Sequence, residues 1–429
     1  MSAPIIPAPP IPSIPEDTGI EREILLKLVG KTLFIHGTMT PSAIAREMRL
    51  SASIISLLLK DLQKLQYVEA KGLAGADIRS ELRFALGGKG HEWVADAMTQ
   101  SQYVGPAPVN LSTFIEQIRR QSIARERITK GKLQECLSHL VLPDDLVDQL
   151  GPAVNSARSV LFYGDPGNGK TSIAIAVGGA FQDTIYVPYC FEVGGQIINF
   201  FDPTIHTPVE IQDTSAAGTN GIAKPAYDMR WQACRRPFVL TGGELNLDML
   251  DLAFNPISRF YEAPVHFKAT GGVFVVDDFG RQRTDPQSVL NRWIIPLERH
   301  HDQLTLHTGK KFSVPFDQLA IFSTNLEPEK LADAGALRRL YYKIKVPTPT
   351  ANDYRSIFED VVAQHDMEFD QTIFTRFFEK NYGIGGSIPA GHHPKYIVDF
   401  IESVCNFRGD RPHMDDALME GGWNNLNVR

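Results

Sequence analysis

A glycine-rich stretch of the chain has the residue types that bind phosphate groups. Residues 164–171 read GDPGNGKT, directly after the apolar run 160–163 and directly before the helix-forming run 171–181. The glycines let successive backbone N–H groups face the phosphates, and the helix behind them adds a partial positive charge. In this pattern Lys170 contacts the β- and γ-phosphates and Thr171 places its hydroxyl on Mg²⁺. The predicted P-loop for ATP and Mg²⁺ comprises Gly164, Asp165, Pro166, Gly167, Asn168, Gly169, Lys170, Thr171 and Ser172.

Two acidic residues follow a second apolar run. Residues 271–276 read GGVFVV and lead into Asp277 and Asp278. Because open α/β sheets place their ligands at the carboxyl ends of strands, we predict that Asp277 holds Mg²⁺ through water. Asp278 then orients and polarises the attacking water. The alternative is a solvated turn, and the position of the pair after a P-loop favours the catalytic role.

Further along the chain, an amide and two guanidinium groups complete the candidate chemistry. Asn325 ends a third apolar run, LAIFST, and we predict that it bonds to the γ-phosphate or the attacking water; capping a turn is the alternative. Arg338 and Arg339 stand beside apolar residues. An arginine that reaches a neighbouring subunit's γ-phosphate stabilises transition-state charge, whereas the alternative is a surface pair. The predicted catalytic residues are thus Asp278, Asn325, Arg338 and Arg339.

These residues require strands that end at one edge of a sheet. From residue 151 to residue 349, apolar strand-like runs alternate with helical stretches, which predicts an α/β domain. Residues 350–429 have a helical pattern and predict a small all-α lid, and residues 106–150 are predicted to be a helical linker.

Taken in this order, the four elements resemble the AAA+ ATPase family over residues 140 to 429. The resemblance makes residues 164–171 the Walker A motif and residues 273–278 the Walker B motif, with Asn325 as sensor 1. The two arginines become finger arginines. It implies an α/β P-loop NTPase core with a C-terminal helical lid, assembled as a hexameric ring with ATP at the subunit interfaces.

The same resemblance implies two further nucleotide contacts. Val141 falls where the family contacts adenine, and Lys395 falls where the family carries its sensor 2 arginine. Residues 297–325 are similar to the hairpin-then-sensor arrangement of the MoxR-type and NtrC-type clades.

The chain also departs from the family pattern. Its Walker B motif ends in Asp-Asp where most active members have Asp-Glu, and sensor 2 is a lysine. Lys170 and Asp277 lie 107 positions apart, so an insertion is predicted at residues 194–268. Its aromatic residues either face a central pore, as in the family, or form the core of the insertion; they include Phe200, Phe201, Phe260 and Tyr261.

The N-terminal part divides into two segments. Residues 1–16 are proline-rich, and we expect a disordered tail, with a docking peptide as the alternative. Residues 17–105 read as helix, turn, helix and β-hairpin, which predicts a winged-helix-like α+β domain. Residues 1–110 carry eleven basic and eleven acidic residues, and the candidate recognition helix offers only Lys60 and Lys64 around Asp61. Protein docking is therefore favoured over DNA binding.

Composition excludes several classes of protein. The 429 residues carry a net charge of −7, four scattered cysteines and no apolar run long enough to span a membrane. The N-terminus lacks the basic region of a signal peptide. We predict a cytoplasmic, ATP-hydrolysing AAA+ ring that remodels or disassembles a protein partner. The alternatives are a nucleic-acid-dependent AAA+ ATPase of replication, transposition or transcription, and a slow ATP-dependent assembly scaffold.

Overall fold

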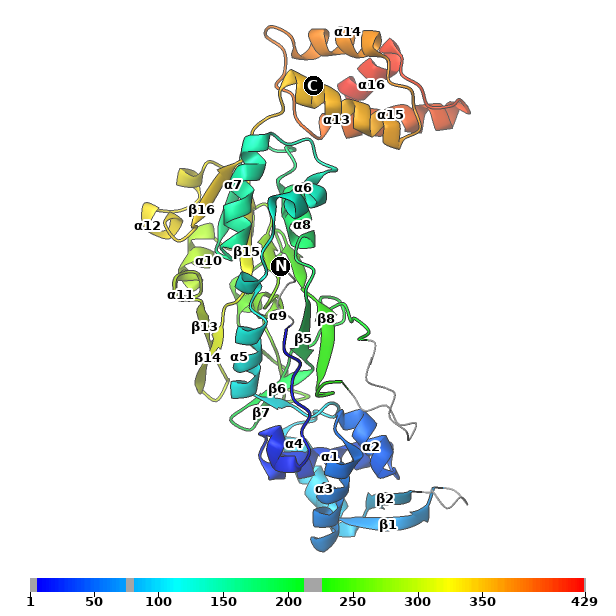
Figure 1. The fold of residues 1–429 in the computed structure, drawn as a ribbon, viewed down its shortest axis with the longest axis vertical. Helices are drawn as coiled ribbons and strands as arrows, with labels where there is room; N and C mark the ends of the chain where they lie inside the picture. The colour runs from blue at the N-terminus through cyan, green and yellow to red at the C-terminus, as the bar shows by residue number, and fades with distance from the viewer. Residues whose placement is uncertain (1–5, 75–80, 212–225, 428–429) are drawn as a thin grey trace.

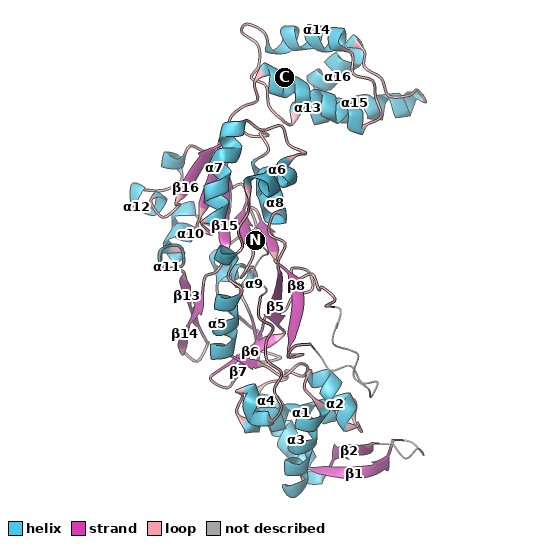
Figure 2. Ribbon diagram, viewed as in Figure 1, coloured by secondary structure: helices cyan, strands magenta, loops and turns pink. Residues whose placement is uncertain are grey.

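The computed structural model describes residues 6–74, 81–211 and 226–427, which form an elongated molecule (Figure 1). An N-terminal module lies at one end and a helical domain at the other. Between them lie a strand-rich middle body and an α/β core, and Figure 2 shows how the strands concentrate there. No helix within these described ranges is both long enough and apolar enough to cross a membrane.

The N-terminal module has the predicted order of helix, turn, helix and hairpin. Thr40 accepts a hydrogen bond from the backbone of Ala43, so the helix predicted at Thr40-Pro41 begins with a side-chain cap. The two strands pair antiparallel, with Val68 opposite Leu86. This order of elements is the one expected for a winged helix, and the assignment of the module to that fold stays a prediction. The elements are α1 (Arg22–His36), α2 (Pro41–Met48), α3 (Ala52–Lys64), β1 (Val68–Leu73), β2 (Leu82–Leu86) and α4 (Gly88–Gln100).

The proline-rich segment is ordered from residue 6, so the prediction of a disordered tail over residues 1–16 is wrong for residues 6–16. The carbonyl of Pro7 accepts a hydrogen bond from Gln117 Nε2 at 3.1 Å, and that of Pro9 accepts one from the backbone of Asp228 at 3.1 Å. Proline lacks a donor but keeps its acceptor, and its stiff backbone loses little entropy when it is fixed. Residues 1–5 lie outside the described residues.

The middle body combines a five-stranded sheet of order β10-β11-β7-β6-β3 with the pair β5-β8 and the hairpin β13-β14. The hairpin predicted ahead of the third apolar run is present and precedes strand β15, while the sensor role of Asn325 stays a prediction. The elements are β3 (Val109–Asn110), α5 (Leu111–Arg120), β5 (Thr184–Pro188), β6 (Cys190–Val193), β7 (Gln196–Asn199), β8 (Trp231–Arg235), β10 (Ala253–Phe254), β11 (Tyr261–Glu262), α9 (Val265–Lys268), β13 (His301–Thr305) and β14 (Lys311–Pro315).

The middle body alters two of the boundaries predicted from the sequence. Part of the linker predicted at residues 106–150 belongs to it, because β3 pairs with β6 and α5 buries Phe114 in the aromatic core. The insertion predicted at residues 194–268 begins earlier, at β5, and it is interrupted by a strand of the main sheet. Phe200 and Tyr261 are 2% and 1% exposed. These two aromatics are therefore core residues and do not face a pore.

The α/β core is a sheet of five parallel strands in the order β16-β4-β15-β12-β9. With the helical domain that follows, it confirms the predicted α/β P-loop core with a C-terminal helical lid. The core comprises α6 (Lys130–Leu137), α7 (Asp144–Asn155), β4 (Val160–Tyr163), α8 (Lys170–Gly179), β9 (Phe238–Thr241), β12 (Val273–Val276), α10 (Pro286–Arg292), α11 (Ile294–Arg299), β15 (Leu319–Thr324), α12 (Ala334–Leu337) and β16 (Tyr342–Lys345). The lid comprises α13 (Ala351–Gln364), α14 (Gln371–Tyr382), α15 (His393–Arg408) and α16 (Asp416–Leu426).

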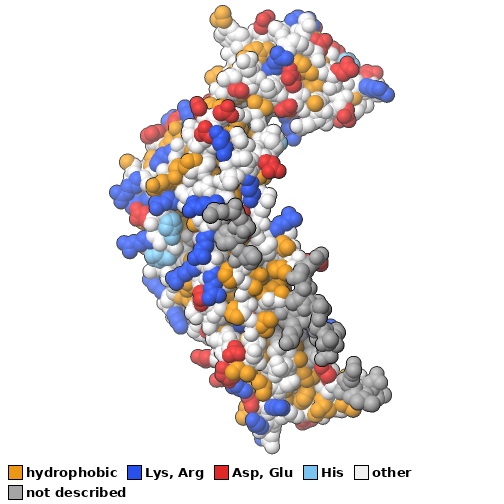
Figure 3. Space-filling model, viewed as in Figure 1, with side chains coloured by type: hydrophobic (Ala, Val, Ile, Leu, Met, Phe, Trp, Pro, Cys, Tyr) orange, Lys and Arg blue, Asp and Glu red, His pale blue; other side chains and the backbone are white. Residues whose placement is uncertain are grey.

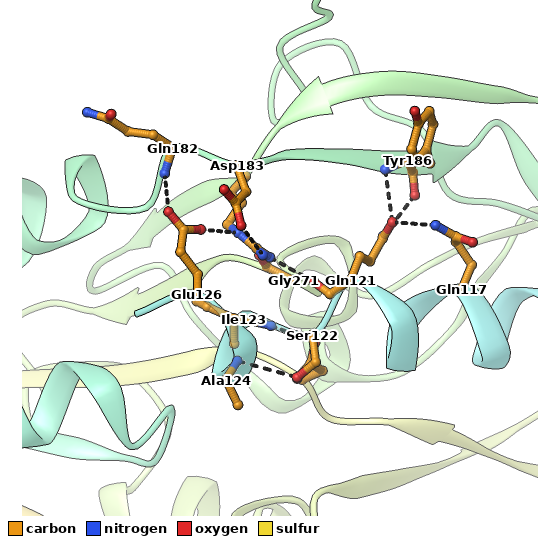
Figure 4. A network of polar contacts seen from close by, with 12 residues as sticks. Gln117, Gln121, Ser122, Ile123, Ala124, Glu126, Gln182, Asp183, Tyr186 and Gly271 are labelled. Carbon is orange, nitrogen blue, oxygen red and sulfur yellow. Dashed lines mark hydrogen bonds and ion pairs between the residues drawn. The ribbon is translucent and has the colours of Figure 1, made fainter. Parts of the chain in front are cut away.

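A buried polar network joins the middle body to the core (Figure 4). Arg236, just before β9, bonds to Glu126 at 2.7 Å and to the Gly271 carbonyl, just before β12, at 2.6 Å. Gln121 exchanges two hydrogen bonds with the backbone of Tyr186 in β5. The side chains of Arg236 and Glu126 are 2% and 5% exposed. This network fixes the amino ends of two core strands against the middle body, at the edge of the sheet opposite their carboxyl ends.

A second buried arginine joins the N-terminal module to the middle body. Arg230 pairs with Asp228 at 2.7 Å and donates to the carbonyls of Thr18 at 3.0 Å and Pro108 at 2.9 Å. Both side chains of the ion pair are 3% exposed. The module is thus built into the rest of the chain through groups that water does not reach.

Replacing Arg230 with alanine should lower the free energy of unfolding by roughly 3–5 kcal/mol, because it leaves a buried carboxylate and two carbonyls without their donor. Denaturant unfolding measures the change. The matched control is Arg376→Ala, which removes an ion pair with Asp416 whose side chains are 53% and 61% exposed; its effect on the free energy of unfolding should be much smaller, because solvent screens an exposed pair. Equal losses in the two variants would contradict the joining role of Arg230.

Candidate nucleotide-binding site

The order of the strands brings the predicted motifs to one edge of the sheet. Strand β15 pairs with β4 on one side and with β12 on the other. The P-loop follows β4, Asn325 follows β15, and Asp277 and Asp278 follow β12. Because all three strands are parallel, their carboxyl ends meet, and the three polar loops lie next to one another.

The P-loop has the backbone that its glycines permit. Gly164, Gly167 and Gly169 have φ angles of 137°, 78° and 82°, which favour glycine. A Cβ atom at Gly164 would lie 2.4 Å from the carbonyl oxygen of Val346, so the loop also needs glycine for close approach. Helix α8 begins at Lys170 and directs its amino terminus into the loop.

Lys170 lies inside the loop and is 6% exposed. Its ammonium group donates to the carbonyls of Gly164 at 2.9 Å and Asp165 at 2.7 Å. Burial lowers the pKa of Lys170, while the carboxylates of Asp165, Asp278 and Asp277 raise it. The ammonium group of Lys170 therefore lies near three carboxylates at the carboxyl ends of the strands.

Thr171 and Asp277 form a set of oxygen donors that suits Mg²⁺. The threonine hydroxyl donates to the Asp277 carboxylate, with distances of 3.0 and 2.9 Å to its two oxygens. Magnesium prefers hard oxygen ligands and commonly takes one or two carboxylates together with phosphate oxygens and water. The residues predicted to hold the metal thus lie in contact and have the right chemistry.

Asp278 and Asn325 also lie in contact, since the Asn325 amide donates to Asp278 Oδ1 at 3.2 Å. Asp278 is exposed to the cleft and has a φ of 48°, a left-handed conformation that few side chains adopt. A carboxylate beside an amide donor can accept a proton from a bound water while the amide holds that water's oxygen. The structure therefore brings together two of the four predicted catalytic residues, Asp278 and Asn325.

A cleft of about 770 Å³ lies between the core and the lid. Figure 3 shows an indentation of the molecular surface below the lid. Residues 166–172 of the P-loop line the cleft, together with both acidic residues and Asn325, whereas Gly164 and Asp165 are not among the lining residues. Val141 and Lys395, placed only by family resemblance, line it as well. The other lining residues, which sequence reasoning missed, are His139, Leu140, Leu142, Ser323, Ile357, Asp360, Val361, Gln364, Gly391, His392, Tyr396 and Asp399.

The two predicted finger arginines differ in their surroundings. Neither lines the cleft. Arg338 is exposed on the surface after α12, whereas the Arg339 side chain is 14% exposed and lies 3.1 Å from Glu298. An arginine that must reach another subunit needs a free guanidinium group, so Arg338 suits the role better than Arg339.

Comparison with known proteins covers the lid and the overall fold. A family described as a domain of unknown function, DUF8689, matches residues 350–425, which coincide with the lid. No curated protein matches the sequence. Among solved structures, NtrX from Brucella abortus in complex with ADP has a TM-score of 0.41 at 14% identity, over 70% of this chain and 59% of that chain. The RuvB Holliday junction branch migration motor of Thermotoga maritima has a TM-score of 0.36 at 12% identity, over 73% of this chain and 74% of that chain. Because these TM-scores are low, the fold is assigned from the strand order and the P-loop described above.

Proposed function

We propose that this chain is an ATPase of the AAA+ type that binds ATP with Mg²⁺ in the cleft and hydrolyses it. The observation that carries the proposal is the contact of Thr171 with Asp277 beside Lys170, at the strand edge that also presents Asp278 and Asn325. Phosphate, metal and water each have a matching group there.

Each residue of the site has its own role in the proposed reaction. Lys170 and the P-loop backbone bind the phosphates, and Thr171 and Asp277 would hold Mg²⁺, which neutralises charge on the β- and γ-phosphates when bound. Asp278 accepts a proton as the water oxygen bonds to the γ-phosphorus and the bond to the ADP oxygen breaks. Asn325 orients that water. The products are ADP and phosphate.

Replacing Asp278 with asparagine should retain ATP binding but lower turnover by about 10²–10⁴-fold, because an amide cannot accept the proton. Phosphate release and calorimetric titration with ATP measure the two quantities. Asp248→Asn is the matched control, since this exposed acid lies outside the cleft. Wild-type turnover in the Asp278 variant would place the catalytic carboxylate elsewhere.

We further propose that the active form is a ring, with six subunits as the family resemblance suggests. No arginine is among the described residues that line the cleft, while Arg338 is exposed away from it. A second copy of the chain can supply the missing guanidinium group at the outer side of the γ-phosphate.

The partner of this ATPase is proposed to be a protein that it remodels or disassembles. In the N-terminal module, Asp61 on helix α3 pairs with Arg22 at 2.6 Å and with Lys64 at 3.3 Å. On the visible face in Figure 3, this module shows charges of both signs. A DNA-binding face would instead gather unpaired cations. A gel-shift titration of the intact chain decides: tight DNA binding at physiological salt with a steep salt dependence would favour the nucleic-acid-dependent alternative.

A further inference from the structure

A second cleft, of about 340 Å³, lies where the N-terminal module meets the middle body. Its walls come from α1, from the end of α4 together with Ser101, and from the start of β7. Lys31 of α1 lines this cleft and is 6% exposed. Its ammonium group donates to the carbonyl of Ser101. A nearly buried amine therefore borders a cleft that is far from the predicted nucleotide site in the fold.

Lys31 lacks the ion pair that would offset the burial of its charge. In the part of the chain that the structure describes, no carboxylate pairs with it. Lys27 lies one turn earlier on the same helix and repels it. Burial, and to a lesser degree this repulsion, lower the pKa of Lys31 to about 8. Desolvation and a neighbouring cation are the two conditions that make a lysine amine a nucleophile.

The other charged side chains of the cleft lie on the same wall as Lys31. They are Glu21, Glu23 and Lys27, whereas α4 and β7 contribute no charged residue to the described lining. Lys27 donates to Glu23 at 2.8 Å and to Gln100 at 3.3 Å. An ammonium group has three N–H donors, so Lys27 can bond one more acceptor. A negative group formed on Lys31 would therefore meet a cation one helical turn away.

We propose that Lys31 is a site of reversible carbamylation by carbon dioxide. The neutral nitrogen gives its electron pair to the carbon of CO₂, so a C–N bond forms and one C=O π bond opens to carry the negative charge. One proton leaves to solvent. The carbamate keeps an N–H group that can still donate to the Ser101 carbonyl.

Two features of the cleft favour carbon dioxide as the reagent. It is small and uncharged, which suits an amine that is 6% exposed. Its product is an anion, so the repulsion between Lys27 and Lys31 becomes an attraction. The inference does not depend on the proposed ATPase activity, because no residue of the nucleotide site takes part in it.

Chemical trapping with the intact wild-type chain tests the proposal. The protein is equilibrated at about pH 8 with ¹³C-labelled bicarbonate as the source of CO₂, carbamates are alkylated to stable esters, and the peptides are analysed by mass spectrometry. At that pH about half of the Lys31 amine is neutral, against under about 1% of an ordinary lysine. Lys31 should therefore carry at least about tenfold more label than Lys60, an exposed lysine of α3.

Two variants locate the label and its stabilising partner. Lys31→Arg keeps a cation at the cleft but has no amine to carbamylate, so the label at residue 31 should disappear while that at Lys60 stays the same. Lys27→Met removes the ammonium group and should lower the label at Lys31 severalfold. No label at Lys31 in the wild type, or equal label at Lys31 and Lys60, would overturn the proposal. Unchanged label at Lys31 in the Lys27 variant would overturn the part assigned to Lys27.

Discussion

Replacing Arg338 with alanine is expected to slow ATP hydrolysis by about 10³–10⁵-fold while the affinity for ATP changes little. The γ-phosphoryl group gains negative charge in the transition state, and Lys170 and the P-loop cover it from one side only. A guanidinium group stays charged and can bond two phosphate oxygens at once, so it suits the uncovered side. Arg338 is exposed and does not line its own cleft, so we expect its target to be the ATP of a second copy.

A mixing experiment checks that Arg338 acts on a second copy. The Arg338→Ala protein keeps a working P-loop, and a Lys170→Ala protein keeps the arginine, so mixed assemblies should recover part of the activity that each lacks alone. Arg339→Ala is the matched control, because this arginine is engaged with Glu298 and should have a much smaller effect on the rate. Mixtures that co-assemble and stay inactive would return Arg338 to a surface role.

Replacing Lys170 with alanine should weaken ATP binding by at least about 100-fold, because it removes the buried charge that we propose bonds to the phosphates. The lysine is 6% exposed and is bonded to two loop carbonyls, so no other side chain can take its place without rebuilding the loop. Calorimetric titration with ATP and Mg²⁺ gives the affinity.

The matched control for Lys170 is Lys395→Ala, which removes an exposed lysine from the lid side of the same cleft. Its loss should weaken binding by less than about tenfold, because an exposed cation is partly screened by solvent. Unchanged ATP affinity in the Lys170 variant would mean that the glycine-rich loop is not the nucleotide site.

The core of the site could be predicted from the sequence because each motif follows directly on an apolar strand. Three short runs end in Gly164, Asp277 and Asn325, and the parallel order of their strands brings those ends together. The local sequence pattern therefore also gives the place of each motif in the fold, since the end of a strand fixes where the next residue lies. The two predicted finger arginines could not be told apart from the sequence. Arg339 pairs with Glu298, which is distant in sequence, whereas Arg338 is exposed.

The proline-rich segment and the predicted insertion could not be predicted as well, because their structure depends on partners far along the chain. The stiff segment at Pro7 and Pro9 is held by Gln117 and Asp228, which no local pattern connects to it. Strand β9 is four residues long and lies inside the predicted insertion, so its pairing with β12 gives no sequence pattern of its own. The histidine pair at the start of α15 offered a signal at His392, but family resemblance directed attention to Lys395.

The left-handed backbone at Asp278 explains a residue choice that the family resemblance left open. At a φ of 48°, glycine, asparagine and aspartate are the residues that fit with least strain, since a short polar side chain can bond locally. A longer glutamate lacks the short side chain that favours this conformation. The proposed role as proton acceptor excludes glycine and asparagine, which have no basic group. The main-chain conformation and the proposed reaction each restrict the amino acid at residue 278. Aspartate satisfies both requirements.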